Sequence, residues 1–133
     1  KGSTNESSQA KYKVLHYFTA DCDKCINELL RAQNFIQKHK TQKEVEYVFI
    51  ACGPTDVYVQ EAIKASGFEH PVYFDQEYFG FKILNDLPIN DNMYNTMLLN
   101  EQNEVLLFGS VFDNEKAEKL FFDIVSYHSV LAR

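Results

Sequence analysis

The stretch Asp21-Cys22-Asp23-Lys24-Cys25-Ile26-Asn27-Glu28 decides the fold of this chain. It follows an apolar run from Tyr12 to Phe18 that is typical of a buried β-strand, and it opens a helical pattern. At a helix start the unpaired backbone N–H groups carry partial positive charge, which favours thiolate over thiol at Cys22. One helical turn separates the two cysteines, so they lie within disulfide reach. The stretch therefore predicts a redox site in which Cys22 attacks a disulfide and Cys25 resolves the product.

The composition fits one globular domain. The chain has 133 residues, of which 45% are hydrophobic, enough for a single packed core. Its net charge is −6 and Lys and Arg do not cluster, which argues against a nucleic-acid or anionic-membrane surface. No apolar run reaches the roughly 18 residues that a membrane-spanning helix needs. We therefore expect no nucleic-acid partner and no membrane insertion by this domain.

The amino-terminal residues have a different composition from the rest. They are rich in Ser, Asn and Gly, and no apolar residue precedes Ala10. This pattern predicts a flexible linker over residues 1–10, followed by a domain over residues 11–133. The chain starts at Lys1 without Met, so we expect a processed or truncated chain, and a lipid or membrane tether upstream of Lys1 would fit the linker.

Strand and helix patterns alternate along the domain. Apolar runs predict strands at 12–18, 45–51, 71–74, 96–99 and 105–108, the last two as a hairpin. Helical periodicity predicts helices that begin near Cys22, with Pro54 in a first turn, after Asp75 and after Asp113. This order predicts an α/β fold with a central mixed sheet of about five strands flanked by helices.

Several motifs resemble one protein family. The run Tyr17-Phe18-Thr19-Ala20-Asp21-Cys22-Asp23-Lys24-Cys25-Ile26-Asn27-Glu28 is similar to the Phe-x-Ala-x-Trp-Cys-x-x-Cys-x-x-Glu motif of periplasmic thiol–disulfide oxidoreductases of the TlpA/ResA type. Val72-Tyr73-Phe74-Asp75 resembles the family's apolar strand that ends in Asp, and Thr96-Met97-Leu98-Leu99-Asn100 resembles its hairpin. The resemblance spans about residues 11–130. It implies a thioredoxin-like fold with a TlpA-type βα insertion at 71–84.

The resemblance also implies an activity. In that family a Glu at the position of Glu28 lies beside the cysteines and tunes proton transfer, so Cys22, Cys25 and Glu28 become the expected catalytic residues. The expected partners are protein thiols and disulfides, with no dissociable cofactor. The expected location is an exported compartment, periplasmic or membrane-tethered and facing the periplasm, and we expect the domain to be a monomer.

Two positions depart from the family's pattern. Asp21 stands where the family has Trp, and Asn95 stands where it has the cis-Pro that shapes the substrate-docking surface. We expect Asp21, Tyr94 and Asn95 to contribute to docking here, and we predict a trans bond between Tyr94 and Asn95. The departures leave a second hypothesis open, a thioredoxin-like binding or scaffold module with weak or no redox activity.

Other chemistries are weaker matches to the sequence. A Cys-x-x-Cys is also half of a zinc site, but Cys52 stands alone and no two histidines have a paired spacing, so we predict no metal. Thr19-x-x-Cys22 resembles a peroxidatic motif, which makes peroxide reduction a third hypothesis. Cys52 is predicted to be a free, buried thiol at the sheet edge where ligand sites gather. His16 is predicted to be a core residue with its polar atoms satisfied.

Overall fold

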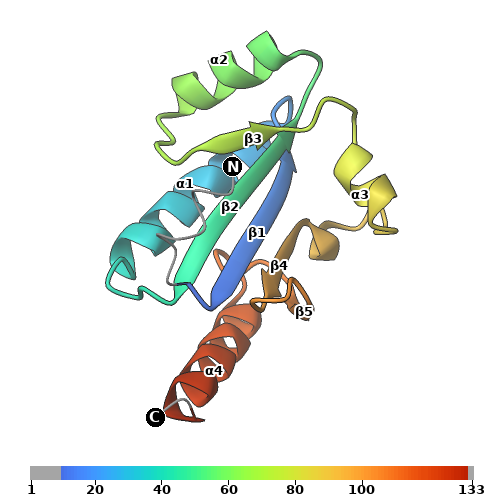
Figure 1. The fold of residues 1–133 in the computed structure, drawn as a ribbon. Helices are drawn as coiled ribbons and strands as arrows, with labels where there is room; N and C mark the ends of the chain where they lie inside the picture. Colours follow the sequence, from blue (N-terminus) through green and yellow to red (C-terminus); the bar gives the residue numbers. More distant parts are fainter. Residues whose placement is uncertain (1–9, 132–133) are drawn as a thin grey trace, which may run out of the picture.

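The fold is built on a five-stranded mixed sheet (Figure 1). The computed structural model describes residues 10–131, with side chains through residue 126, so the predicted linker lies outside the described residues except for Ala10. The elements in chain order are β1 (Tyr12–Thr19), α1 (Asp23–Lys38), β2 (Val45–Cys52), α2 (Asp56–Ser66), β3 (Val72–Phe74), α3 (Gly80–Leu84), the 3-10 helix η2 (Asn92–Asn95), β4 (Thr96–Leu99), β5 (Val105–Phe108) and α4 (Glu115–Leu131).

The strand order in the sheet is β3-β2-β1-β4-β5. The first three strands run parallel, with Tyr12 opposite Val45 and Thr19 opposite Cys52. β4 pairs antiparallel with β1, and β5 pairs antiparallel with β4. The predicted mixed sheet of five strands is confirmed. The pairing with β2 continues to the carboxyl end of β1, at Thr19, and the cysteine motif follows directly from that end.

The three longer helices pack on one face of the sheet. Leu29 and Phe35 of α1, Val59 of α2 and Phe121 of α4 are buried there in two clusters with alternate residues of the strands. Burial of each such side chain contributes roughly 1.5–3 kcal/mol, so this face holds most of the stabilising apolar contact. Figure 1 shows α3 standing apart from these helices.

The opposite face of the sheet is covered by α3 and the chain that follows it. Leu15, Met97 and Leu99 are buried on this face, and Phe81 and Leu87 pack against them. A cavity of about 390 Å³ lies here, lined by these five residues together with Lys13, Val48, Asn85, Asn103 and Val105. It is the largest of the cavities that we describe, but it borders no cysteine and no carboxylate, so it is not the place for thiol chemistry.

Helix α2 begins later than predicted. Its first residue is Asp56, and the Thr55 hydroxyl accepts a hydrogen bond from the Tyr58 N–H at 3.0 Å. Pro54 lies before the helix and not in its first turn, because Thr55 supplies the side-chain cap that a proline cannot. The predicted end is confirmed, since Gly67 follows the helix with a left-handed φ of 82°.

Helix α4 is capped by a different residue from the one predicted. The Asn114 side chain accepts a hydrogen bond from the Ala117 N–H at 3.0 Å, so Asn114 and not Asp113 is the cap. Asp113 instead forms an ion pair with Arg31 of α1 at 3.2 Å. The two residues are adjacent and both are good cap formers, so composition alone did not decide between them.

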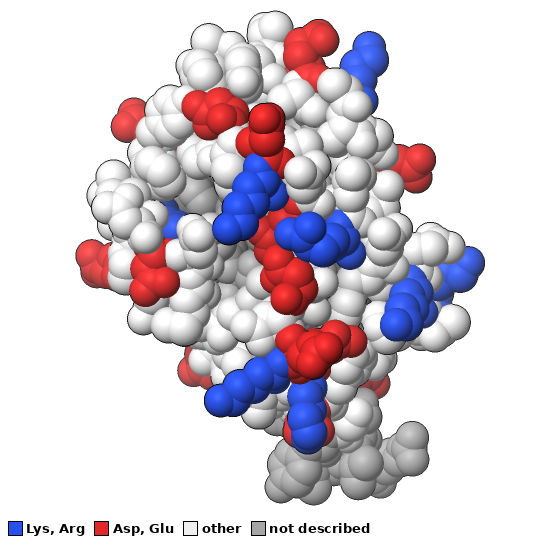
Figure 2. Space-filling view, turned by 180° about the vertical axis from the view of Figure 1, so that it is seen from behind, with Lys and Arg blue, Asp and Glu red and all other residues white. Residues whose placement is uncertain are grey.

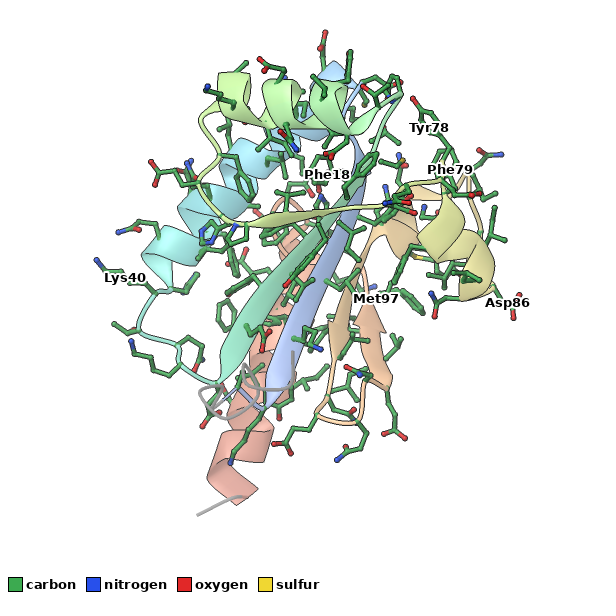
Figure 3. The ribbon with its side chains drawn as sticks, turned by 45° about the horizontal axis from the view of Figure 1, so that its top comes forward. Phe18, Lys40, Tyr78, Phe79, Asp86 and Met97 are labelled. Carbon is green, nitrogen blue, oxygen red and sulfur yellow. The ribbon has the colours of Figure 1, made fainter. Side chains whose placement is uncertain are left out.

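Helix α3 is shorter than the predicted helix. It begins at Gly80, and Tyr78 and Phe79 lie before it, while Asp86 lies just beyond its carboxyl end (Figure 3). Asp75 is not the residue next to the helix, but its Oδ2 atom accepts a hydrogen bond from the Phe81 N–H at 2.8 Å. The carboxylate therefore still satisfies an amide in the first turn of the helix.

The surface carries both signs of charge. On the face behind the view of Figure 1, acidic and basic side chains lie next to one another (Figure 2). Lys119 and Asp123, four residues apart in α4, form an ion pair at 3.0 Å. None of the helices within the described residues is long and apolar enough to span a bilayer.

Candidate functional site

The two cysteines of the motif lie where β1 passes into α1. Cys22 is the N-cap of α1, with extended backbone angles, and its sulfur accepts a hydrogen bond from the Cys25 N–H at 3.2 Å. Both side chains are partly exposed and both thiols are free. A sulfur that receives a backbone N–H at a helix start is placed to carry negative charge. This is the geometry that the sequence predicted for an attacking thiol.

Cys25 has different surroundings. It lies in the first turn of α1, and its sulfur is 3.7 Å from the Thr19 hydroxyl. Burial raises the pKa of the Cys25 thiol, and the neighbouring Cys22 raises it further, against the opposing effect of Thr19. The raised pKa was expected from the position of Cys25 within the helix. Cys25 therefore holds its proton more tightly than an ordinary thiol.

Glu28 lies one turn after Cys25 on the same side of α1. Its Oε2 atom accepts a hydrogen bond from the Ser110 hydroxyl at 2.8 Å. Burial raises the pKa of the Glu28 carboxyl, while the Ser110 hydrogen bond opposes the shift. Glu28 and Cys25 line one cavity of about 200 Å³, together with Lys24, Asn92, Asn95, Thr96, Ser110 and Asp113. A carboxyl with a raised pKa that shares a cavity with a thiol is suited to proton exchange.

His16 lies next to Glu28, and one of its two ring nitrogens has no hydrogen bond, contrary to the prediction. Its Nδ1 atom is 2.7 Å from the Thr96 hydroxyl, but its Nε2 atom is buried without a hydrogen-bond partner. That Nε2 atom lies 3.9 Å from Oε1 of Glu28. The prediction of a fully satisfied core histidine is therefore wrong, because Nε2 has no hydrogen-bond partner and Oε1 of Glu28 lies beyond hydrogen-bond distance.

Burial also sets the charge of His16. It lowers the pKa of the imidazole to about 4, so the ring is neutral at physiological pH. If the Thr96 hydroxyl donates to Nδ1, the ring proton is on Nε2 and faces Glu28. His16 and Ser110 thus lie against the carboxyl of Glu28, and Thr96 lines the same cavity. The sequence pattern predicted no role at the site for any of the three. Only the position of His16 inside a strand next to the motif was a signal.

A second cavity lies on the other side of the cysteines. It has a volume of about 290 Å³ and borders both Cys22 and Cys25. Its wall opposite α1 comes from α3 and the segment before β4. The lining residues besides the cysteines are Tyr17, Phe18, Thr19, Lys24, Phe79, Lys82, Ile89, Asn90, Asn92 and Asn95. A substrate chain that brings a disulfide to Cys22 would meet this wall.

The three expected docking residues lie in different settings. Asn95 lines both cavities, and its side-chain oxygen accepts a hydrogen bond from Lys82. Tyr94 packs its ring against Phe108 of β5, with 4.7 Å between the ring centroids. Asp21 is exposed and accepts a hydrogen bond from the Tyr78 hydroxyl at 3.0 Å. The described residues contain no cis peptide bond, so the predicted trans bond between Tyr94 and Asn95 is confirmed.

Cys52 is fully buried at the end of β2, as predicted. It contacts the Tyr17 hydroxyl, which donates a hydrogen bond to Asp75 at 2.7 Å. Burial raises the pKa of Tyr17, and its contacts with Cys52 and Asp75 add to that shift. Within the described residues, no group of three His, Cys, Asp or Glu side chains is arranged to hold a metal ion.

Comparisons with known proteins locate the fold. The chain matches no protein-family model. It also matches no curated protein sequence. Solved structures do match it, with 33 chains at a significant level. All of those described below share less than 20% sequence identity with this chain, so the likeness concerns the fold.

Three solved structures illustrate the likeness. The C-terminal domain of a Bacteroides thetaiotaomicron protein that carries the name thiol-disulfide oxidoreductase has a TM-score of 0.66 at 15% identity, covering 92% of this chain and 83% of that one. The thioredoxin-related protein of Neisseria meningitidis serogroup B has a TM-score of 0.61 at 17% identity, with 93% and 90% covered. StoA of Bacillus subtilis has a TM-score of 0.55 at 19% identity, with 79% of each chain covered. The chain therefore has the thioredoxin-like fold.

Proposed function

We propose that this chain is a thiol–disulfide oxidoreductase that exchanges disulfides with protein partners through Cys22 and Cys25. One observation carries the proposal. Two free thiols one helical turn apart lie at the amino-terminal end of α1, where one accepts a backbone N–H and the other has a raised pKa. That asymmetry is what an attacking thiol and a resolving thiol need.

In the first step, the Cys22 thiolate attacks one sulfur of the substrate disulfide. A bond forms between Cys22 and that sulfur, and the substrate's own disulfide bond breaks. The second substrate sulfur leaves as a thiolate. The Cys25 N–H, which already contacts the Cys22 sulfur, favours its charged form before the attack.

In the second step, Cys25 loses its proton to Glu28 and attacks the Cys22 sulfur. The bond between Cys22 and Cys25 forms, the mixed disulfide breaks, and the substrate sulfur that was bound to Cys22 leaves and takes up the proton from Glu28. Two electrons pass from the cysteine pair to the substrate. The raised pKa of Glu28 makes its carboxylate a stronger base, and the raised pKa of Cys25 keeps that thiol protonated until this step. The same steps run in reverse when the chain starts oxidised.

The setting that fits this chemistry is an exported compartment in which protein disulfides persist. We propose a monomeric domain over residues 11–133, with residues 1–10 as its linker and with protein thiols and disulfides as partners. This assignment rests on the family resemblance of the Cys-x-x-Cys-x-x-Glu motif. Localisation of a tagged full-length chain by cell fractionation tests it.

Insulin reduction tests the activity. With dithiothreitol as the electron source, the wild-type chain should accelerate precipitation of the insulin B chain, and a Cys22→Ser, Cys25→Ser double variant should not. If wild type and double variant are equally inactive, the binding or scaffold hypothesis replaces the enzyme. Consumption of hydrogen peroxide by the wild type without insulin reduction would instead favour the peroxide-reduction hypothesis that Thr19-x-x-Cys22 suggested.

A further inference from the structure

Lys82 is a buried lysine on the wall that faces the cysteines. It belongs to the short helix α3, and only 1% of its surface is exposed. Lysine is among the residues least often fully buried, because removing an ammonium group from water is costly. Among the described residues no carboxylate forms an ion pair with it. Something other than a counter-charge must therefore hold it in place.

The ammonium of Lys82 contacts neutral oxygen atoms. It donates a hydrogen bond to the side-chain oxygen of Asn95 and a second one to the Ile89 carbonyl at 3.4 Å. It also lies 5.9 Å from the centroid of the Tyr17 ring, within the range of a cation–π contact. Burial lowers the pKa of Lys82, while Asp91 opposes the shift. These contacts satisfy a group that would otherwise be unpaired.

The two hydrogen-bond acceptors stand at opposite ends of one segment. Residues 89–95 are the second part of the connection between α3 and β4, and η2 is their only regular structure. Lys82 touches the first and the last residue of this segment. Figure 1 shows α3 next to the chain that leads into β4. One side chain thus ties both ends of the segment to α3 and to the sheet residue Tyr17.

The same segment forms one side of the cavity beside the cysteines. Ile89, Asn90, Asn92 and Asn95 line it opposite Cys22 and Cys25. Apart from the Asp91 cap of η2 and a long contact between Asn92 and Asn95, no other side-chain hydrogen bond is described within the segment. The Tyr94 ring also packs against Phe108, and the Tyr94 N–H donates to the Asp91 carbonyl. The contacts of Lys82 add to these by tying both ends of the segment to α3.

We infer that Lys82 is a positioning residue that holds residues 89–95 in the shape that docks a protein substrate in front of Cys22. The inference rests on the proposed function and states which substrates need Lys82, namely polypeptides that carry a disulfide. A polypeptide that carries a disulfide must lie against this wall, whereas a small disulfide reaches the Cys22 sulfur without it. Lys82 thus governs the use of large substrates and not the reactivity of the thiols.

The test compares two substrates in the full chain. Lys82→Met keeps most of the buried stem and removes the ammonium, and Lys64→Met, an exposed position on α2, is the matched control. For Lys82→Met, we expect the KM for insulin to rise about tenfold, which corresponds to ~1.4 kcal/mol of lost binding. The rate with 4,4′-dithiodipyridine, a small neutral disulfide, should remain that of the wild type. Equal effects on both substrates, or no effect on either, would overturn the inference.

A second variant separates positioning from general damage. Asn95→Ala removes one acceptor at a partly exposed position, so it should fold even if Lys82→Met does not. It should raise the KM for insulin by less than Lys82→Met does, because only the Lys82–Asn95 hydrogen bond is lost. The double variant should show the effect of Lys82→Met alone, because both substitutions break that same hydrogen bond. Additive effects would show that Lys82 and Asn95 act separately and would overturn the inference.

Hydrogen exchange tests the inference even if the chain proves inactive. In Lys82→Met the amides of residues 90–95 should exchange faster than in the wild type and in Lys64→Met, while those of β1 should not. An unchanged exchange pattern would overturn the role of Lys82 on its own. A wild type that reacts with neither substrate would overturn the proposed function, and the exchange result would still stand.

Discussion

The Nε2 atom of His16 lies 3.9 Å from Oε1 of Glu28, and this buried nitrogen has no hydrogen-bond partner. The pair joins the centre of β1 to the cavity that borders Cys25. Because burial keeps His16 neutral, the pair is not one of two full charges. With the Thr96 hydroxyl donating to Nδ1, it is a ring N–H dipole that faces the carboxyl. We therefore expect the protonation of Glu28 to depend on this buried residue.

Replacing His16 tests this dependence. His16→Phe fits among the aromatic rings around the site, but it removes the N–H that faces Glu28 and leaves the Thr96 hydroxyl unpaired. We expect the pKa of Glu28 to rise further, because its carboxylate loses a nearby positive dipole. We also expect a loss of about 1–3 kcal/mol in the free energy of unfolding. An NMR titration of the Glu28 carboxyl carbon measures the first effect, and an unchanged titration would contradict it.

Single cysteine variants distinguish the two thiols. Cys25→Ser should trap a mixed disulfide between Cys22 and a substrate, because the resolving thiol is gone. Cys22→Ser should trap nothing and should not exchange. Non-reducing gel electrophoresis after incubation with a protein disulfide shows the trapped species. Capture through Cys25 in the Cys22→Ser protein would reverse the assignment.

The raised pKa of Glu28 predicts a pH dependence of stability. A carboxyl whose pKa is higher in the folded than in the unfolded protein favours folding below its ordinary pKa, and that contribution is lost as pH rises through the folded pKa. Gln does not titrate, so Glu28→Gln should become more stable relative to wild type as pH increases across that range. Urea unfolding at several pH values measures the difference. Glu61→Gln, at an exposed position on α2, should show no such trend.

Glu28→Gln should also affect exchange. We expect it to be slower at neutral pH with a changed pH profile, because Gln cannot accept the proton of Cys25. Stopped-flow measurement of the second step, the closure of the Cys22–Cys25 disulfide, isolates this effect. A normal rate of closure would remove Glu28 from the mechanism.

The fully buried Cys52 should react poorly in the folded protein. Its side chain is enclosed beside Tyr17, whereas that of Cys22 is partly exposed. Under native conditions we expect iodoacetamide to modify Cys22 well before Cys52, and mass spectrometry of the digested protein measures both. Modification of Cys52 at the rate of Cys22 would indicate that a third thiol takes part.

Alanine substitutions at Asn114 and Asp113, the two candidate caps of α4, should lower the free energy of unfolding by different amounts. Asn114→Ala should lower the free energy of unfolding by about 1 kcal/mol, because the Ala117 N–H loses its acceptor. Asp113→Ala removes an exposed ion pair with Arg31, for which about 0.2–1 kcal/mol is typical. Thermal unfolding of both variants compares them. A larger loss for Asp113→Ala would restore the cap that the sequence predicted.

The sequence predicted those features that local patterns encode. Apolar runs located β1 and β2 nearly to the residue, and the spacing of Cys22 and Cys25 located the start of α1. The contacts that complete the site could not be predicted in this way. Glu28 and Ser110 are 82 positions apart, and His16 and Thr96 are 80 apart, so their contacts arise only when the sheet brings distant strands together.

The exact starts of the helices and the contacts of buried polar residues could not be predicted from the sequence either. Thr55 and Asn114 cap their helices next to residues that looked equally suitable, and the choice depends on how the preceding chain enters each helix. The burial of Lys82 was not predicted, because a lysine in a short helix is ordinarily exposed to solvent. Its role depends on Asn95, thirteen positions later, and on a segment with no periodicity.

The N-cap of α1 is the sulfur of a cysteine in the proposed redox pair. In the proposed mechanism, the sulfur that accepts the Cys25 N–H is also an atom that changes oxidation state. A sulfur bonded to a second sulfur is a poorer acceptor than a thiolate, so oxidation weakens the first turn of the helix at the same time as it forms a covalent bond across it. By thermodynamic linkage, whatever the cap adds to the stability of the reduced fold makes the oxidised protein a stronger acceptor of electrons. The hydrogen bond from the Cys25 N–H to the Cys22 sulfur therefore affects both the stability of the first turn of α1 and the reduction potential of the cysteine pair.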